Sequence, residues 1–147
     1  MDAGIYLEKI RSDDRSIEIK LMISDGSSDF RTDAWVGYAD LAAIVKDLDR
    51  FKREIHGGIY DMRLGAFGPE FAGGALHARL HFYPPGHGRI YITVQAESGW
   101  HDFTLNKVAS RATLYIKTEP ALLDNFIEEF GRFAADSTDE AFLNCKT

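Results

Sequence analysis

The chain has 147 residues, 45% of them hydrophobic and 27% charged, which is typical of one soluble globular domain. Its formal net charge of −6 argues against binding to the phosphate backbone of a nucleic acid. The single cysteine, Cys145, excludes an internal disulfide and agrees with a reducing cytoplasm, and neither a signal peptide nor a membrane-spanning segment is expected.

Alternating apolar residues predict strands at the start of the chain. Residues 5–11 and 16–23 are two such segments, and every second residue from Ile17 to Ile23 is aliphatic. The segment SDGSSD that follows has the composition of a turn. We therefore expect a third strand at 30–36.

Two segments have the apolar spacing of amphipathic helices, in which a hydrophobic residue recurs every three or four positions. The first runs from residue 41 to 55, and Asp40 is expected to cap its N-terminus. The second lies in TEPALLDNFIEEFGRFAA (118–135), with Thr118 as its expected N-cap and an apolar side from Leu122 to Phe133. Each helix has one apolar stripe, so each should pack on a sheet with that stripe.

Further strands are expected between the helices. They lie at 62–67, 76–83 and 89–97, followed by 103–106 and 112–117, which form either two strands or one long bent strand. The order is then three strands, a helix, four or five strands and a helix. Hairpin-length connections predict a mostly antiparallel meander sheet with both helices on one face, which is a two-layer α+β sandwich.

We assign residues 1–136 to this single α+β domain and residues 137–147 to a polar C-terminal tail. Within the tail, Phe142 and Leu143 are apolar and are expected to dock on the domain or on a partner. Cys145 lies near the end of the tail, where a nucleophile would be hard to position, so we assign it no catalytic role.

The segment HARLHFYPPGHGRIYITVQAE, residues 77–97, predicts a β-hairpin with a loop at 84–88. On both strands the even-numbered residues are apolar and the odd-numbered residues are polar or amphipathic, so one register keeps the two sets apart. This register places opposite one another Tyr83 and Arg89, His81 and Tyr91, Arg79 and Thr93, and His77 and Gln95.

The polar side of this hairpin is the candidate binding surface. Its residues are His77, Arg79, His81, Tyr91, Thr93 and Gln95. Arginine, tyrosine and histidine suit an anion or a protein surface, although a solvated or subunit-buried sheet face has the same composition. His77 and His81 would lie about 13 Å apart on a strand, too far to share one metal ion, so no metal or cofactor is expected.

No catalytic residue can be assigned from the sequence. Ser98, His101 and Asp102 lie close in sequence, but neighbouring residues on a strand point to opposite sides and cannot form a triad. The carboxylates considered for acid–base chemistry are Asp61, Glu70 and Glu97. Nothing in the sequence indicates that any two of them meet.

The layout of the chain has a resemblance at the level of pattern. A hairpin runs into WVGYADLAAIVKDL (35–48), a meander follows, and LLDNFIEEFGRF (122–133) comes after it. The layout resembles small bacterial α+β families of unknown function and immunity proteins of polymorphic toxin systems. The second resemblance implies a non-catalytic acidic protein that occludes the active site of a toxin. It transfers no functional residue.

These observations favour a non-enzymatic protein-interaction domain, binding a protein partner or a second copy as a homodimer through the open sheet face. Nucleic acid and membrane are not expected as partners. One alternative is a small-ligand-binding or hydrolytic protein with a pocket between sheet and helices, lined by loops 65–75 and 98–102. Another is a structural subunit of a larger assembly.

Overall fold

Ten strands and two helices make up the described part of the protein, a computed structural model in which residues 1–54, 58–84 and 88–145 are described. The first part of the chain contains β1 (Gly4–Ser12), β2 (Ser16–Ser24), β3 (Asp29–Gly37) and α1 (Tyr38–Arg53). The middle part contains β4 (Ile59–Ala66), β5 (Gly73–Tyr83), β6 (Arg89–Gly99), β7 (His101–Phe103), β8 (Asn106–Val108) and β9 (Arg111–Thr118). The last part contains α3 (Pro120–Ala134) and β10 (Glu140–Asn144).

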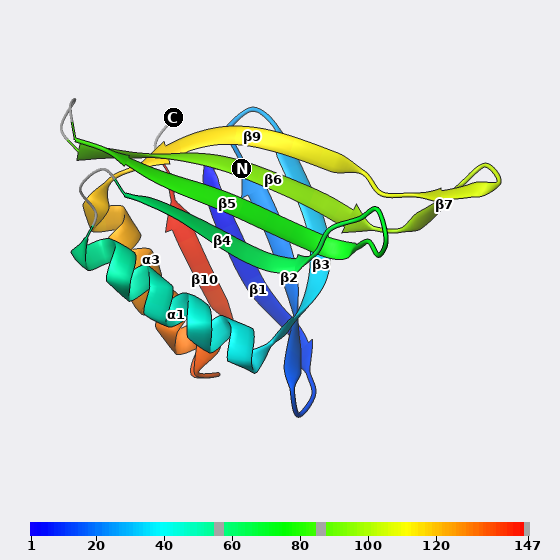
Figure 1. Cartoon of the computed structure of the whole chain (residues 1–147), viewed down its shortest axis with the longest axis horizontal. Helices are drawn as coiled ribbons and strands as arrows, with labels where there is room; N and C mark the ends of the chain where they lie inside the picture. The colour runs from blue at the N-terminus through cyan, green and yellow to red at the C-terminus, as the bar shows by residue number, and fades with distance from the viewer. Residues whose placement is uncertain (55–57, 85–87, 146–147) are drawn as a thin grey trace.

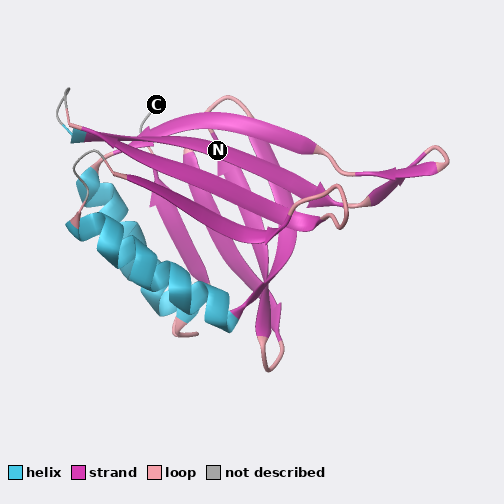
Figure 2. Cartoon of the chain, in the orientation of Figure 1, coloured by secondary structure: helices cyan, strands magenta, loops and turns pink. Residues whose placement is uncertain are grey.

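Eight of the strands form two four-stranded antiparallel sheets that pack against each other (Figure 1). Sheet A has the strand order β10-β1-β2-β3, and sheet B has the order β4-β5-β6-β9. The strands β7 and β8 form a separate hairpin that projects from one end of sheet B (Figure 1). Both helices lie along one side of the sandwich (Figure 2). The predicted α+β sandwich and its order of elements are confirmed.

One hydrophobic core joins both sheets and both helices. Every second residue from Ile17 to Ile23 is buried on β2, as the period of a strand requires. The helices contribute the apolar stripes that their spacing predicts, with Leu48 on α1 and Phe130 on α3 fully buried. The even-numbered residues of β5 and β6 face this core, which leaves their odd-numbered residues for the opposite side.

The division into two sheets changes what covers sheet B. The sequence suggests helices over the inner side of a single meander, whereas β3 of sheet A packs directly on β4, β5 and β6. The two sheets meet at glycines. Gly65 and Gly74 have φ values of 79° and 89°, and a Cβ on Gly74 would lie 1.8 Å from the carbonyl oxygen of Asp33. Only glycine allows this approach.

Several expected element ends are wrong. Helix α1 begins at Tyr38 with Gly37 as its N-cap residue, so Asp40 lies in the first turn and does not cap. The N-cap of α3 is Glu119, because Thr118 belongs to β9, where its hydroxyl donates to the carbonyl oxygen of Asn144 at 2.8 Å.

The strand expected at 103–106 is instead the end of the β7–β8 hairpin, with Thr104 at a φ of 57°. Its hydrophobic residues do not pack in the core, since Phe103 and Leu105 are exposed. Part of the predicted 84–88 loop, and Ile55 at the end of the first apolar stripe, lie outside the described residues.

The segment set apart as a polar tail contributes β10 to sheet A. This strand pairs with β1, and Ala141, Leu143 and Cys145 are buried. Phe142 stacks on Tyr6 with ring centroids 4.0 Å apart. The pair Phe142–Leu143 therefore docks on the body of the protein, and sheet A includes residues beyond 136.

The two helices have 16 and 15 residues, and in the described chain neither has the length and apolar character that crossing a membrane requires.

Candidate functional site

The candidate surface is the side of sheet B that faces away from sheet A, which we call the outer face. The predicted register of the hairpin is confirmed, from Tyr83 opposite Arg89 to His77 opposite Gln95. Pairing with β4 and β9 extends this register into rows that cross the whole sheet. The three central rows are Ile59–His81–Tyr91–Lys117, Asp61–Arg79–Thr93–Tyr115 and Arg63–His77–Gln95–Thr113.

The six predicted site residues all lie on the outer face. Arg79, His81, Tyr91 and Gln95 are exposed, whereas His77 and Thr93 are half-buried. The intervening even-numbered residues of the same strands are buried. This alternation leaves the outer face open to solvent over the middle of sheet B (Figure 1).

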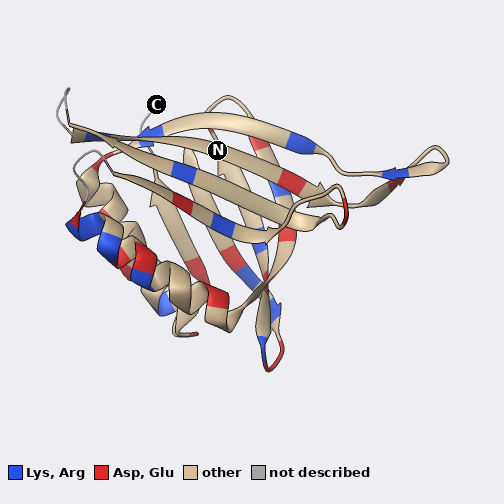
Figure 3. Cartoon of the chain, viewed as in Figure 1, with Lys and Arg blue, Asp and Glu red and all other residues tan. Residues whose placement is uncertain are grey.

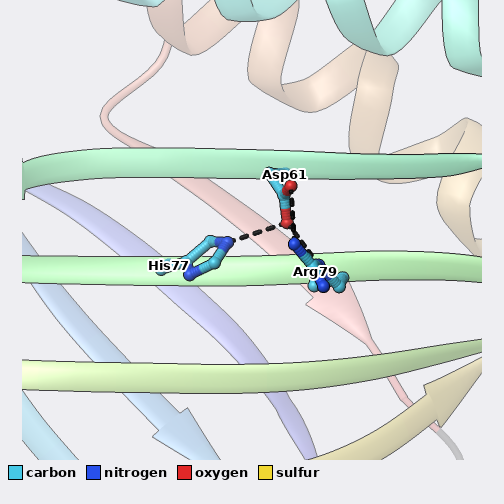
Figure 4. Close-up of polar contacts among 3 residues, drawn as sticks. All are labelled: Asp61, His77 and Arg79. Carbon is cyan, nitrogen blue, oxygen red and sulfur yellow. Dashed lines mark hydrogen bonds and ion pairs between the residues drawn. The ribbon is translucent and has the colours of Figure 1, made fainter.

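An ion-pair cluster lies at the centre of the outer face, where Asp61 on β4 contacts two residues of β5 (Figure 4). The Nε and Nη2 atoms of Arg79 donate to the two carboxylate oxygens at 2.8 Å and 3.2 Å. The Nε2 atom of His77 lies 2.8 Å from Oδ1, and because an ionised carboxylate only accepts, this nitrogen is the donor. Asp61 thus orients both basic side chains.

The cluster stabilises the ionised form of the carboxylate. Hydrogen bonds from Arg79 and His77 lower the pKa of Asp61 from 3.8 to about 2, against the smaller opposing effect of burial. A carboxylate with this pKa is ionised and hydrogen-bonded near neutral pH, so it is poorly suited to accept a proton as a general base. The geometry is that of a structural ion pair on the outer face.

Asp61→Asn should make the protein less stable near neutral pH and remove part of its acid sensitivity. The lowered pKa contributes stability above about pH 4 that is lost as the pH falls toward 2. Because the Asp61 and Arg79 side chains are 29% and 54% exposed, solvent screening reduces the effect to about 1 kcal/mol. Urea unfolding of wild type and variant at pH 6 and at pH 2.5 measures it.

The two unfolding curves should differ at pH 6 and approach each other at pH 2.5. Asp49→Asn, on the exposed side of α1, is the matched control and should leave the pH dependence unchanged. An equal difference at both pH values would contradict the assignment of the stabilisation to the ionised carboxylate.

Basic residues outnumber acidic ones on the outer face, although the whole chain is acidic (Figure 3). The basic members are Arg63, Arg79, Arg89, Arg111 and Lys117, and the acidic members are Asp61 and Glu97. Tyrosines stand among them, with Tyr91 45% exposed and Tyr115 73% exposed. The outer face therefore combines positive charge with aromatic area.

Glu97 is held in a second ion pair at the end of sheet B. Its side chain is 1% exposed, accepts from the N–H of Gly68 at 2.6 Å and accepts from Nε of Arg111 at 2.5 Å. In register it lies opposite Ala75, four residues along β5 from Arg79. Asp61 and Glu97 are therefore in separate clusters, and each carboxylate is satisfied by its own arginine.

The loops proposed to line a pocket lie next to this second ion pair. Residues 67–69 and Trp100 border two open hollows of about 220 and 450 Å³ that share Glu97 and Arg111. Their lining residues include the end of β6 and the start of β9, and this end of sheet B is away from the two helices (Figure 1). The loops therefore border the outer surface of sheet B.

The other residues considered for nucleophilic chemistry are Ser98, His101, Asp102 and Cys145. Ser98 donates through its hydroxyl to the carbonyl oxygen of Gly99 and accepts from the N–H of Ser110, so it binds the start of β9 to β6. His101 and Asp102 are adjacent residues of β7 and are exposed. Burial raises the pKa of the Cys145 thiol to about 12, which keeps it protonated at neutral pH.

The sequence interpretation missed several members of the outer face. The expected strand at 62–67 began one residue after Asp61 and therefore left this carboxylate off the sheet. The alternation of IYDMRLGA, in which Met62 and Leu64 are buried, would have placed Asp61 and Arg63 together on the polar side. On β9 the same alternation places Tyr115 and Lys117 there.

No family model matches the chain, and the searches of curated proteins and of solved structures also find no match.

Proposed function

We propose that the protein is a non-enzymatic interaction domain whose outer face on sheet B binds an acidic surface of another protein. The single observation that carries the proposal is the excess of basic side chains on this exposed, tyrosine-bearing face of a chain whose net charge is −6. Complementary charge brings partners together and orients them. Exposed tyrosines add contact area at a low entropy cost.

The ion pair of Asp61 supports this role because it fixes the orientation of the Arg79 side chain before a partner binds. Arginine side chains lose conformational freedom when they bind a partner. Arg79 is already oriented by two hydrogen bonds to Asp61 while its side chain remains 54% exposed. Tyr83 and Tyr91 are in edge-to-face contact at 6.0 Å, which restrains their rings as well. A preorganised surface of this kind binds with a smaller ordering cost.

A different protein suits this face better than a second copy. If two outer faces met about a two-fold axis, the basic rows would lie against each other, which like charges oppose. An immunity-like role, in which the face covers the active site of a toxin, is one form of the proposed function. It requires the covered surface to be acidic.

The proposal is tested by titrating isotope-labelled protein with a polyglutamate peptide and following amide chemical shifts by NMR. The largest shifts are expected at Arg79, Tyr91 and Gln95. The double variant Arg79→Glu/Tyr91→Glu should weaken binding at least about tenfold, and added salt should weaken wild-type binding. Arg31→Glu, at an exposed position of β3 in sheet A, makes the same charge change as Arg79→Glu and should leave binding nearly unchanged.

Two results would count against the proposal. Shifts concentrated on sheet A would place the acidic probe elsewhere. Tighter binding of a DNA duplex than of polyglutamate at the same salt concentration would indicate a nucleic-acid surface.

A further inference from the structure

Strand β9 is an edge of sheet B that the rest of the described chain leaves open. It pairs with β6 on one side, and no other described element packs extensively on it. The other edge strands contact further elements, since β4 contacts α1 and β3, β3 contacts β5 and β6, and β10 contacts α3. An uncovered edge strand presents a row of backbone donors and acceptors to any strand that approaches.

The backbone hydrogen bonds show which N–H and C=O groups of β9 point away from β6, at the open edge of sheet B. The N–H of Phe82 donates to the carbonyl oxygen of Gly58, so the backbone N–H and C=O groups of even-numbered residues of β5 point toward β4, and those of odd-numbered residues point toward β6. On β6 the backbone groups of even-numbered residues then point toward β9, as the bond from the N–H of Ser98 to the carbonyl oxygen of Ser110 also indicates. The peptide groups that point away from the sheet belong to Arg111, Thr113, Tyr115 and Lys117.

Strand β9 has few of the devices that usually protect an open edge, since Arg111 and Lys117 are its only charged residues. Its sequence RATLYIKT contains no proline, and its inward side carries no charge. Its centre is rich in residues that favour strands. A hollow of about 410 Å³ separates its second half from Asp25 and Ser27 in the β2–β3 turn, so sheet A leaves room beside it. The edge is therefore both accessible and prone to pairing.

We propose that β9 pairs with β9 of a second copy, antiparallel and about a two-fold axis that passes beside Tyr115. Tyr115 then lies opposite Tyr115 of the second copy, with backbone hydrogen bonds in both directions and Cα atoms about 5.5 Å apart. Thr113 lies opposite Lys117, and inside the sheet Leu114 lies opposite Ile116. In this register, side chains of the outer face lie opposite outer-face side chains, and core-facing side chains lie opposite core-facing side chains.

Charge and the length of the overlap favour this register over the registers shifted by one residue of the axis in either direction. Centring the axis on Leu114 would put Arg111 opposite Lys117 of the second copy, and like charges in directly opposite positions are destabilising. Centring it on Ile116 would shorten the paired segment. The Tyr115 register keeps the long overlap without a like-charge pair, so β9 is complementary to itself. This self-complementarity favours a second copy over an unrelated strand.

Pairing at β9 would join the outer faces of both copies into one surface. Tyr115 is in the same row as Thr93, Arg79 and Asp61, so this row would continue into the second copy. The inference concerns the edge and does not depend on what the outer face binds. Loss of the dimer and loss of polyglutamate binding can therefore be measured separately.

The test uses the full chain and compares charge variants at the proposed axis by sedimentation velocity. Wild type should sediment as a dimer of the 16.5 kDa chain. Tyr115→Glu and Tyr115→Arg each place like charges opposite each other and should each raise the dimer dissociation constant at least about tenfold. A one-to-one mixture should recover a dimer with one copy of each variant, because only then are the charges opposite.

The matched control repeats the substitutions at Tyr91, which lies on the outer face but not at the edge. Tyr91→Glu and Tyr91→Arg should each remain dimeric. Tyr115 is 73% exposed, so its variants should keep the wild-type circular dichroism spectrum. A monomeric wild type, dimeric Tyr115 variants, or a mixture that stays monomeric would each overturn the proposal.

Discussion

Deleting residues 137–147 is expected to unfold most of the protein under conditions in which the full chain is folded. The deletion removes β10, whose Leu143 is 1% exposed, and uncovers the edge of β1 and the side of α3 that packs on β10. It also removes the carbonyl that accepts from Thr118. The expected loss is more than about 4 kcal/mol, which is most of the stability of a typical domain.

Circular dichroism and urea unfolding of the shortened chain measure this loss. A chain that ends at Cys145 retains β10 and should unfold like the full chain. Leu143→Ala keeps the strand but removes its largest buried side chain, and it should cost about 2–4 kcal/mol. A shortened chain with the full unfolding midpoint would show that residues 1–136 form a domain without β10.

Gly74→Ala is expected to be the most damaging small substitution in sheet B. The residue has a φ of 89°, which side-chain-bearing residues rarely adopt, and the new Cβ would lie 1.8 Å from the carbonyl oxygen of Asp33. That oxygen is backbone and belongs to β3, so relief requires the two sheets to separate locally. The combined strain and overpacking should cost about 3 kcal/mol or more.

Gly131→Ala is the matched control for Gly74→Ala. Gly131 lies in α3, and apart from its chain neighbours and the backbone of its own helix no atom lies within 4 Å of an added Cβ, so the same added methyl group should stabilise the helix by about 0.5–1 kcal/mol. Urea unfolding of both variants beside wild type gives the comparison. A loss at Gly74 no larger than the change at Gly131 would contradict a tight contact between the sheets.

The elements that depend on local pattern were predictable. From 76 to 97, strict alternation allowed only one register without mixing apolar and polar residues, and the structure has that register. The helices followed from their apolar stripes. These features depend on residues that are close in sequence, where a period of two or of 3.6 is decisive.

The features that depend on distant residues were not predictable. The sequence of β3 does not indicate that this strand pairs with β2 in sheet A while it packs on β5 of sheet B. Contacts between distant parts of the chain decide which sheet a strand joins. β10 is short, and its partner β1 lies at the other end of the chain. The contact of Asp61 with Arg79 likewise depends on the register between β4 and β5. No short hairpin turn joins these two strands, so the sequence did not fix their register.

The pairing of Gly4 with Asn144 has a consequence for how the protein is made. During translation the emerging chain can form the β1–β2–β3 meander early, but the fourth strand of sheet A is still unsynthesised. Until residue 144 has left the ribosome, β1 presents an unpaired border, and α3 has no strand to cover it. Sheet A can therefore be completed only after β10 has been synthesised, although its other three strands are made first.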